Sequence, residues 1–209
     1  MGLKDAEALR SFCLELSSSD PAPGGGSASA AAGAMAASLL VMVCSITAKS
    51  KKHASKKDQL EEQISMLADR RDNLVELARE DARAYDLVVD SFRRHRVEGT
   101  ETTARGVDEA LMYAAEIPLR TAGECIGVLE SSVKVAELGV RNASSDVGVA
   151  VHLAEAGFKG ASMNVRINLK EIKDREFVLL AEDRLSMYDQ RAKDLVRDAM
   201  ERLGKDSRE

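Results

Sequence analysis

Tryptophan is absent from this 209-residue chain, and all aromatic residues together make up only 3% of it. Strands are enriched in aromatic and β-branched residues, whereas Ala, Leu and Met favour helices. The core must therefore be built from Ala, Leu, Val, Ile and Met, which suits closely packed helices. Proline is also scarce, none follows Pro118, and no alternating strand pattern persists. The sequence predicts an all-α protein.

Cysteine is equally sparse, with Cys13, Cys44 and Cys125 far apart and no CxxC pair. This pattern predicts buried thiols in a reducing compartment. The first ten residues contain no apolar leader, so we expect a cytoplasmic protein. The net charge of −5 gives no support for nucleic-acid binding. The length fits one domain, predicted to span residues 1–209.

Charged residues are missing from Pro21 to Ala48. A helix of that length could cross a bilayer, but its first part consists of Ala, Gly and Ser. Gly33 and Ala37, four residues apart, would let another helix approach closely. Because a helix that is apolar all round is also typical of a protein interior, we interpret the segment as a buried central helix and expect no membrane contact.

Apolar spacing predicts further helices around this one. A first helix includes Leu3 to Leu16, and a long one runs from about Lys57 to Phe92, before a break at Val97 to Thr103. A helix from about Thr103 to Leu138 should kink or split at Pro118. The pattern predicts an up-and-down bundle of long helices around the buried Ala- and Gly-rich one.

The C-terminal third is predicted from its capping residues and glycines. Ser145 or Asp146 could cap a helix that Gly157 and Gly160 bring to an end. A short helix would then carry Asn164 and Asn168 on one face, and Asp174 would open the last helix. Several of these polar residues could face a ligand.

The first candidate site is the turn Gly24-Gly25-Gly26-Ser27, which directly precedes the uncharged helix. Free backbone N–H groups and the positive end of a helix dipole can hold an anion or a carbonyl oxygen, and Ser27 could cap the helix. The alternative is a flexible connector. The spacing matches neither a P-loop nor a dinucleotide-binding turn.

The second candidate is Asp81, which lies on the apolar seam of the long helix. A carboxylate there is costly unless it is paired or borders a polar cavity. A catalytic role and a structural salt bridge with an Arg of another helix both remain open. The basic run that includes Lys51 and Lys52 could complement the dipole of the helix that it follows, or bind an anionic substrate tail. No His, Cys and carboxylate cluster has metal-binding spacing.

Three segments of the chain together resemble the cyclodeaminase/cyclohydrolase family of folate enzymes. They are SSSDPAPGGGSASAAAGAMAASLLVMVCSITAKSKK, EDARAYDLVVDSFR and SSDVGVAVHLAEAGFKGASMNVRINLKEIKD. The likeness covers nearly the whole chain in the same order. Two departures are Arg94-His95-Arg96, where family members often have a Leu-Pro-Lys turn, and His53, where many have an aromatic residue.

The resemblance implies an all-helical homodimer with a folate cleft. Asp81 would be the acidic catalytic residue, with Lys51 donating a proton or binding the glutamate tail. The residues implied to line the cleft are Gly24, Gly25, Gly26, Ser27, Lys52, Asp146, Asn164 and Asn168. The substrate would be a tetrahydrofolate, either with a single glutamate or polyglutamylated, with no metal and no other cofactor.

Three functions agree with this resemblance. The first is a cyclohydrolase that opens the N5,N10-methenyl bridge to 10-formyltetrahydrofolate. The second is a cyclodeaminase that releases ammonia from formimidoyltetrahydrofolate. The third is a folate-binding helical protein without turnover. We rank the cyclohydrolase first, because this chain has no formiminotransferase domain to hand over a formimino substrate.

Overall fold

The structure, a computed structural model, describes residues 4–206. Helices make up its regular structure, and no strand occurs in that range, which confirms the all-α prediction. The elements are α1 (Lys4–Leu16), α2 (Gly25–Ala48), η1 (Lys51–Lys56), α3 (Lys57–Glu98), α4 (Glu101–Leu138), η2 (Arg141–Ala143), α5 (Ser144–Asn168), η3 (Leu169–Glu171) and α6 (Arg175–Asp206). Leu3, expected in the first helix, lies outside the described residues.

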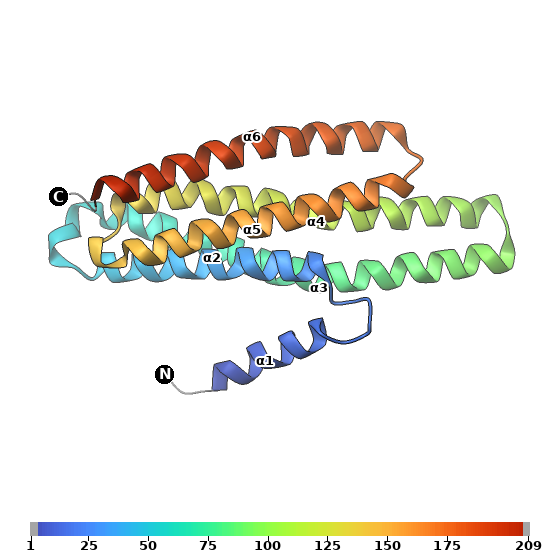
Figure 1. Cartoon of the computed structure of the whole chain (residues 1–209), viewed down its shortest axis with the longest axis horizontal. Helices are drawn as coiled ribbons and strands as arrows, with labels where there is room; N and C mark the ends of the chain where they lie inside the picture. Colours follow the sequence, from blue (N-terminus) through green and yellow to red (C-terminus); the bar gives the residue numbers. More distant parts are fainter. Residues whose placement is uncertain (1–3, 207–209) are drawn as a thin grey trace.

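Helices α2 to α6 form the expected up-and-down bundle (Figure 1). α2 packs against α3, α4 and α5, while α6 lies on α4 and α5. α2 is long and apolar enough to pass for a membrane span, yet three of its sides are covered by other helices. The fourth side is open, and Met35, Met42 and Ile46 are exposed on it. The central helix is thus buried in the bundle on all sides but one.

The α3–α4 hairpin extends past the start of α2 (Figure 1). α3 continues to Glu98, beyond the expected end at Phe92. Gly99 then adopts φ 62°, a left-handed conformation that glycine tolerates without strain. Thr100 and Thr103 form a reciprocal capping box that starts α4. The predicted break between the two helices is confirmed.

The sequence predicted a kink or a split at Pro118. The split is wrong, because α4 continues without a break through Pro118. Proline lacks the N–H that would bond to the carbonyl four residues earlier, that of Ala114. The side chain of Asn168 replaces this donor, since its Nδ2 donates to Ala114 O at 2.8 Å. A tertiary hydrogen bond therefore satisfies the carbonyl that the proline leaves free.

Gly157 and Gly160 do not end a helix, contrary to the sequence prediction. α5 passes through both glycines, so Asn164 and Asn168 belong to its last turns. A Cβ at Gly157 would lie 2.7 Å from Ser29 O and 3.1 Å from Gly33 N of α2. The glycines allow α2 and α5 to pack closely where they cross. Local sequence rules cannot distinguish a glycine needed for such packing from a glycine that ends a helix.

Two predicted caps are also wrong, and one is confirmed. α2 starts with Gly24 as its N-cap, so Ser27 lies inside the first turn. α5 starts after Ala143, which places Ser145 and Asp146 in its first turn as well. Asp174 does precede α6, and its Oδ1 accepts from Phe177 N at 3.0 Å.

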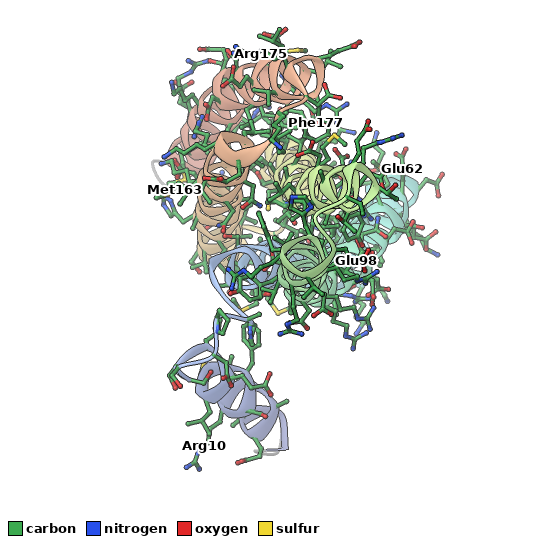
Figure 2. The ribbon with its side chains drawn as sticks, turned by 90° about the vertical axis from the view of Figure 1, so that its right-hand side faces the viewer. Arg10, Glu62, Glu98, Met163, Arg175 and Phe177 are labelled. Carbon is green, nitrogen blue, oxygen red and sulfur yellow. The ribbon has the colours of Figure 1, made fainter. Side chains whose placement is uncertain are left out.

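α1 stands apart from the bundle, and Figure 2 shows it projecting away with Arg10 on its outer side. Most of its side chains are exposed, including Leu9 and Leu14. Cys13 is exposed too, which corrects the expectation that all three thiols are buried; Cys44 and Cys125 are buried.

Candidate functional site

The site begins where α2 meets α3 and α5. No side chain caps the first turn of α2. A Cβ on Gly26 would overlap the carboxylate of Asp81. A Cβ on Gly25 would lie 3.4 Å from Asn164 Nδ2, an ordinary contact. Positive φ is found only at Gly99 within residues 4–206. The glycine turn therefore provides close approach to Asp81 rather than an unusual backbone conformation.

Asp81 is partly buried on the seam of α3 and faces Ser27. Ser27 Oγ lies 3.0 Å from Asp81 Oδ2 and 2.9 Å from Ala78 O. Burial raises the pKa of Asp81 above its ordinary value, while hydrogen bonds from the Ser27 hydroxyl and backbone N–H oppose the rise. Ser27 itself is fully buried. It therefore holds the carboxylate and is too enclosed to line a substrate cleft.

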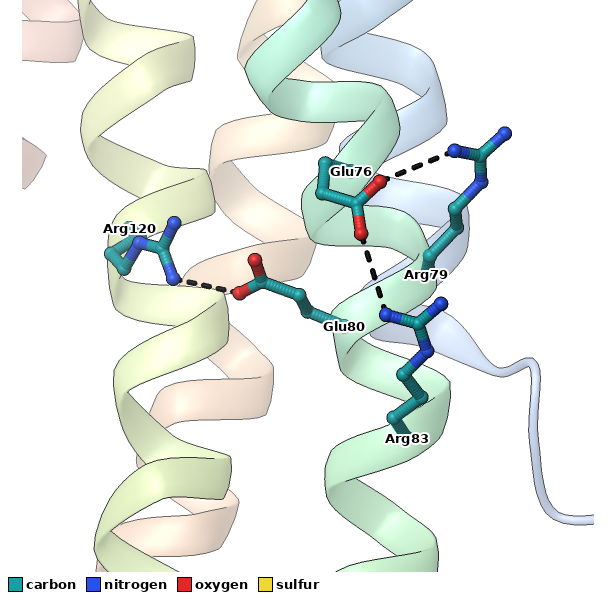
Figure 3. A network of polar contacts seen from close by, with 5 residues as sticks. All are labelled: Glu76, Arg79, Glu80, Arg83 and Arg120. Atoms are coloured by element: carbon teal, nitrogen blue, oxygen red, sulfur yellow. Dashed lines mark hydrogen bonds and ion pairs between the residues drawn. The ribbon is translucent and has the colours of Figure 1, made fainter.

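A salt bridge with an Arg of another helix was the structural alternative for Asp81. Glu80, the residue before Asp81, makes such a salt bridge instead. Its Oε2 lies 2.7 Å from Nη1 of Arg120, which belongs to α4 (Figure 3). Arg79 and Arg83 both pair with Glu76 on the same helix. No ion pair reaches Asp81 from any side chain that the structure describes. The carboxylate is partly buried without a charge partner, an arrangement typical of functional carboxylates.

The two asparagines lie at this same end of α2, but they are used differently. Asn164 Nδ2 donates to Gly160 O at 2.9 Å, and its amide lies against Gly25. The amide nitrogen of Asn168 donates its hydrogen bond to Ala114 O. Asn164 is thus the better placed of the two for a ligand, and Asn168 has a structural task.

The remaining predicted residues lie at the opposite end of the bundle. Lys51 and Lys52 follow the C-terminus of α2, about 36 Å from Gly25 at the usual helical rise. Asp146 lies in the first turn of α5, about 27 Å along that helix from Asn164. Within one chain these three residues do not share a site with Asp81. The sequence alone could not show this separation, because it depends on the direction of each helix.

Comparison with known proteins decides the family. Residues 8–187 match the family described as formiminotransferase-cyclodeaminase. The chain belongs to this family. It is 37% identical over 181 residues to the methenyltetrahydrofolate cyclohydrolase of Methylorubrum extorquens, covering 86% of each chain.

Longer relatives and a solved structure agree with this family assignment. The formimidoyltransferase-cyclodeaminase of Sus scrofa is 30% identical over 93% of this chain, which spans only 36% of that protein. The formiminotetrahydrofolate cyclodeaminase from Thermotoga maritima superimposes with a TM-score of 0.86 at 28% identity, over 94% of this chain and 96% of that one. The chain therefore corresponds to the cyclodeaminase part of the longer relatives.

Proposed function

We propose that the chain is a methenyltetrahydrofolate cyclohydrolase in which Asp81 activates water. The observation that carries the proposal is a partly buried carboxylate without an ion-pair partner, fixed by Ser27 at the positive end of α2. The likeness to the bacterial cyclohydrolase over 86% of both chains supports the same reaction.

The reaction needs a base and compensation for a cationic substrate. Water adds to the methenyl carbon, and Asp81 accepts one of its protons. The resulting hydroxyl loses its proton as the bond from carbon to N5 breaks, N5 takes up one proton, and one proton leaves to solvent. An ionised carboxylate in a site of low dielectric also stabilises the substrate cation. Backbone N–H groups at the start of α2 would hold the oxygen of the developing formyl group.

The cyclodeaminase is the second candidate. Expelling ammonia requires an acid near the departing nitrogen, and a histidine side chain such as that of His95 could supply the proton. His95 lies about 21 Å along α3 from Asp81, and its Nδ1 is 2.9 Å from Thr103 Oγ1. This distance favours the cyclohydrolase, which needs no leaving-group acid. A folate-binding protein without turnover is the third candidate.

The substrate is proposed to be a tetrahydrofolate, with or without additional glutamates in its tail. We also propose a homodimer, because the open side of α2 exposes apolar residues along an uncharged helix. A cytoplasmic location and activity without added metal remain predictions.

Absorbance of the methenyl group tests the function, because hydrolysis removes it and cyclodeamination creates it. We expect faster loss of absorbance with methenyltetrahydrofolate than gain with formimidoyltetrahydrofolate, each corrected for the spontaneous rate. A faster gain would identify the cyclodeaminase instead. Binding of folate without either change would support the non-catalytic protein.

A further inference from the structure

A cavity of about 360 Å³ lies between α1 and the helices α2 and α3. Its volume is within the range of pockets that bind small molecules. Most of its lining residues are apolar, namely Phe12, Pro23, Ala31, Val75, Ala78 and Ala82. Their side chains offer no hydrogen bond to a ligand, so the cavity suits an aromatic or aliphatic group rather than a polar one.

The cavity adjoins the hydrogen-bonded pair of Ser27 and Asp81. Ala31 follows Ser27 by four residues on α2, and Ala78 precedes Asp81 by three residues on α3. Residues at these spacings share one face of a helix, with Cβ atoms about 5–6 Å apart. Ala78 O also accepts from Ser27 Oγ at 2.9 Å. A ligand that reacts at Asp81 can therefore extend directly into this cavity.

Two charged side chains complete the lining, and they belong to different walls. Arg79 comes from α3 and Glu15 from α1. Arg79 is exposed, and its Nη1 lies 3.2 Å from Glu76 Oε2, which leaves most of its N–H donors available (Figure 3). An anionic group at the rim of the cavity would be attracted by Arg79 and repelled by Glu15. The cavity thus combines apolar walls with one edge that suits an anion.

We infer that this cavity binds the aminobenzoyl ring of the substrate and that Arg79 binds the glutamate carboxylate that follows the ring. The inference rests on the proposed function, in which the methenyl carbon lies at Asp81. N10 carries both that carbon and the aminobenzoyl ring, so the ring must lie close to Asp81. The pteridine ring fits the cavity poorly, because its nitrogens and carbonyl oxygen need hydrogen-bond partners that the apolar walls lack.

Helix α1 supplies one wall of this subsite. It makes no extensive contact with any other element in the described range, and Figure 2 shows it apart from the bundle. Its Phe12 is half-buried and lines the cavity, so an aromatic ring bound there can stack against it. Because α1 lies outside the bundle, it can adjust to the ring without disturbing the other helices. Substrate binding is thus a task for a helix that adds little to the core.

Arg79→Gln tests the position of the glutamate tail. The KM for methenyltetrahydrofolate should rise by up to about fivefold with kcat unchanged, because an exposed ion pair is lost equally from the bound substrate and the transition state. The KM for the methylamide of methenyltetrahydropteroate, which keeps the ring and has no carboxylate, should not change. Arg83→Gln is the matched control, because Arg83 also pairs with Glu76 but does not line the cavity. Equal effects on both substrates, or in both variants, overturn the role of Arg79.

Phe12→Ala tests the position of the ring. The KM for both substrates should rise by about tenfold, because both contain the ring that stacks against Phe12. Leu14→Ala is the control on the same helix, since Leu14 is exposed and does not line the cavity. Circular dichroism of both variants should match the wild type. An unchanged KM in Phe12→Ala contradicts the inference.

Binding of p-aminobenzoylglutamate separates this inference from the proposed function, because the fragment has no bridge to hydrolyse. Ligand-observed NMR at millimolar fragment should detect binding to the wild type and to Asp81→Asn, and weaker binding to Phe12→Ala and Arg79→Gln. No binding to the wild type, or equal binding by all four proteins, overturns the subsite even where methenyl hydrolysis is normal. Fragment binding that depends on Phe12 and Arg79 in a chain without turnover supports the subsite and contradicts the proposed function alone.

Discussion

The Ser27 hydroxyl has one proton and two acceptors, Asp81 Oδ2 at 3.0 Å and Ala78 O at 2.9 Å. When Asp81 is ionised, the hydroxyl can donate to the carboxylate. When Asp81 is protonated, the hydroxyl can turn to Ala78 O and accept from the acid. Asp81 thus keeps a hydrogen bond in both protonation states, which suits a group that takes up and releases a proton in each turnover.

Ser27→Ala should move the acidic limb of the kcat/KM profile to higher pH. The variant loses a hydrogen bond to the charged carboxylate, so the pKa of Asp81 rises further above its usual range. The base is then protonated over more of the working range. Ser38→Ala is the matched control, because Ser38 Oγ only donates to Ala34 O on the same helix. An unchanged acidic limb in Ser27→Ala would refute the coupling.

Gly26→Ala should nearly abolish activity, whereas Gly25→Ala should retain most of it. The new methyl group at position 26 would overlap the Asp81 carboxylate and push it from its position. At position 25 the nearest atom is 3.4 Å away, and the residue is already helical. Steady-state rates and circular dichroism of both variants check this. Equal loss in both would indicate that the whole turn requires flexibility.

Asn168→Ala should lower the free energy of unfolding by about 0.5–1.5 kcal/mol, the usual net contribution of one hydrogen bond, because the partly buried carbonyl of Ala114 loses its partner. In a Pro118→Ala background the cost should shrink, because the restored N–H can bond to Ala114 O within α4. Urea unfolding of the two single variants and the double variant measures this coupling. Independent, additive effects would contradict the exchange of donors.

The fold followed from patterns that the sequence displays locally. Apolar spacing predicted α3, the lack of charge predicted the central position of α2, and Gly99 lies in the predicted break. The errors at Pro118, Gly157 and Gly160 have one cause. Each residue is tolerated inside a helix because of contacts with another helix, and such contacts leave no local pattern.

The candidate site was predictable only where its residues stand out in the local sequence. Asp81 stood out as a charge on an apolar seam, and Gly25 with Asn164 came from motifs. The sequence could not show why position 26 requires glycine, because that depends on where the Asp81 carboxylate lies. The separation of Lys51 and Asp146 from Asp81 depends on the direction of α2 and α5, which the motifs do not encode.

Asp81→Asn tests the central claim most directly. Burial raises the pKa of Asp81 in the folded protein. The ionised carboxylate therefore lowers the free energy of unfolding. This loss begins as the pH rises above the pKa of Asp81 in the unfolded chain, and it is complete above the folded pKa. Replacing it with a neutral amide should leave thermal stability at pH 7 equal or higher. Hydrolysis of methenyltetrahydrofolate should fall to the spontaneous rate, while folic acid, which has no bridge to hydrolyse, should bind as it does to the wild type. Near-normal hydrolysis, or a loss of stability in place of activity, would contradict the assignment of Asp81 as the base.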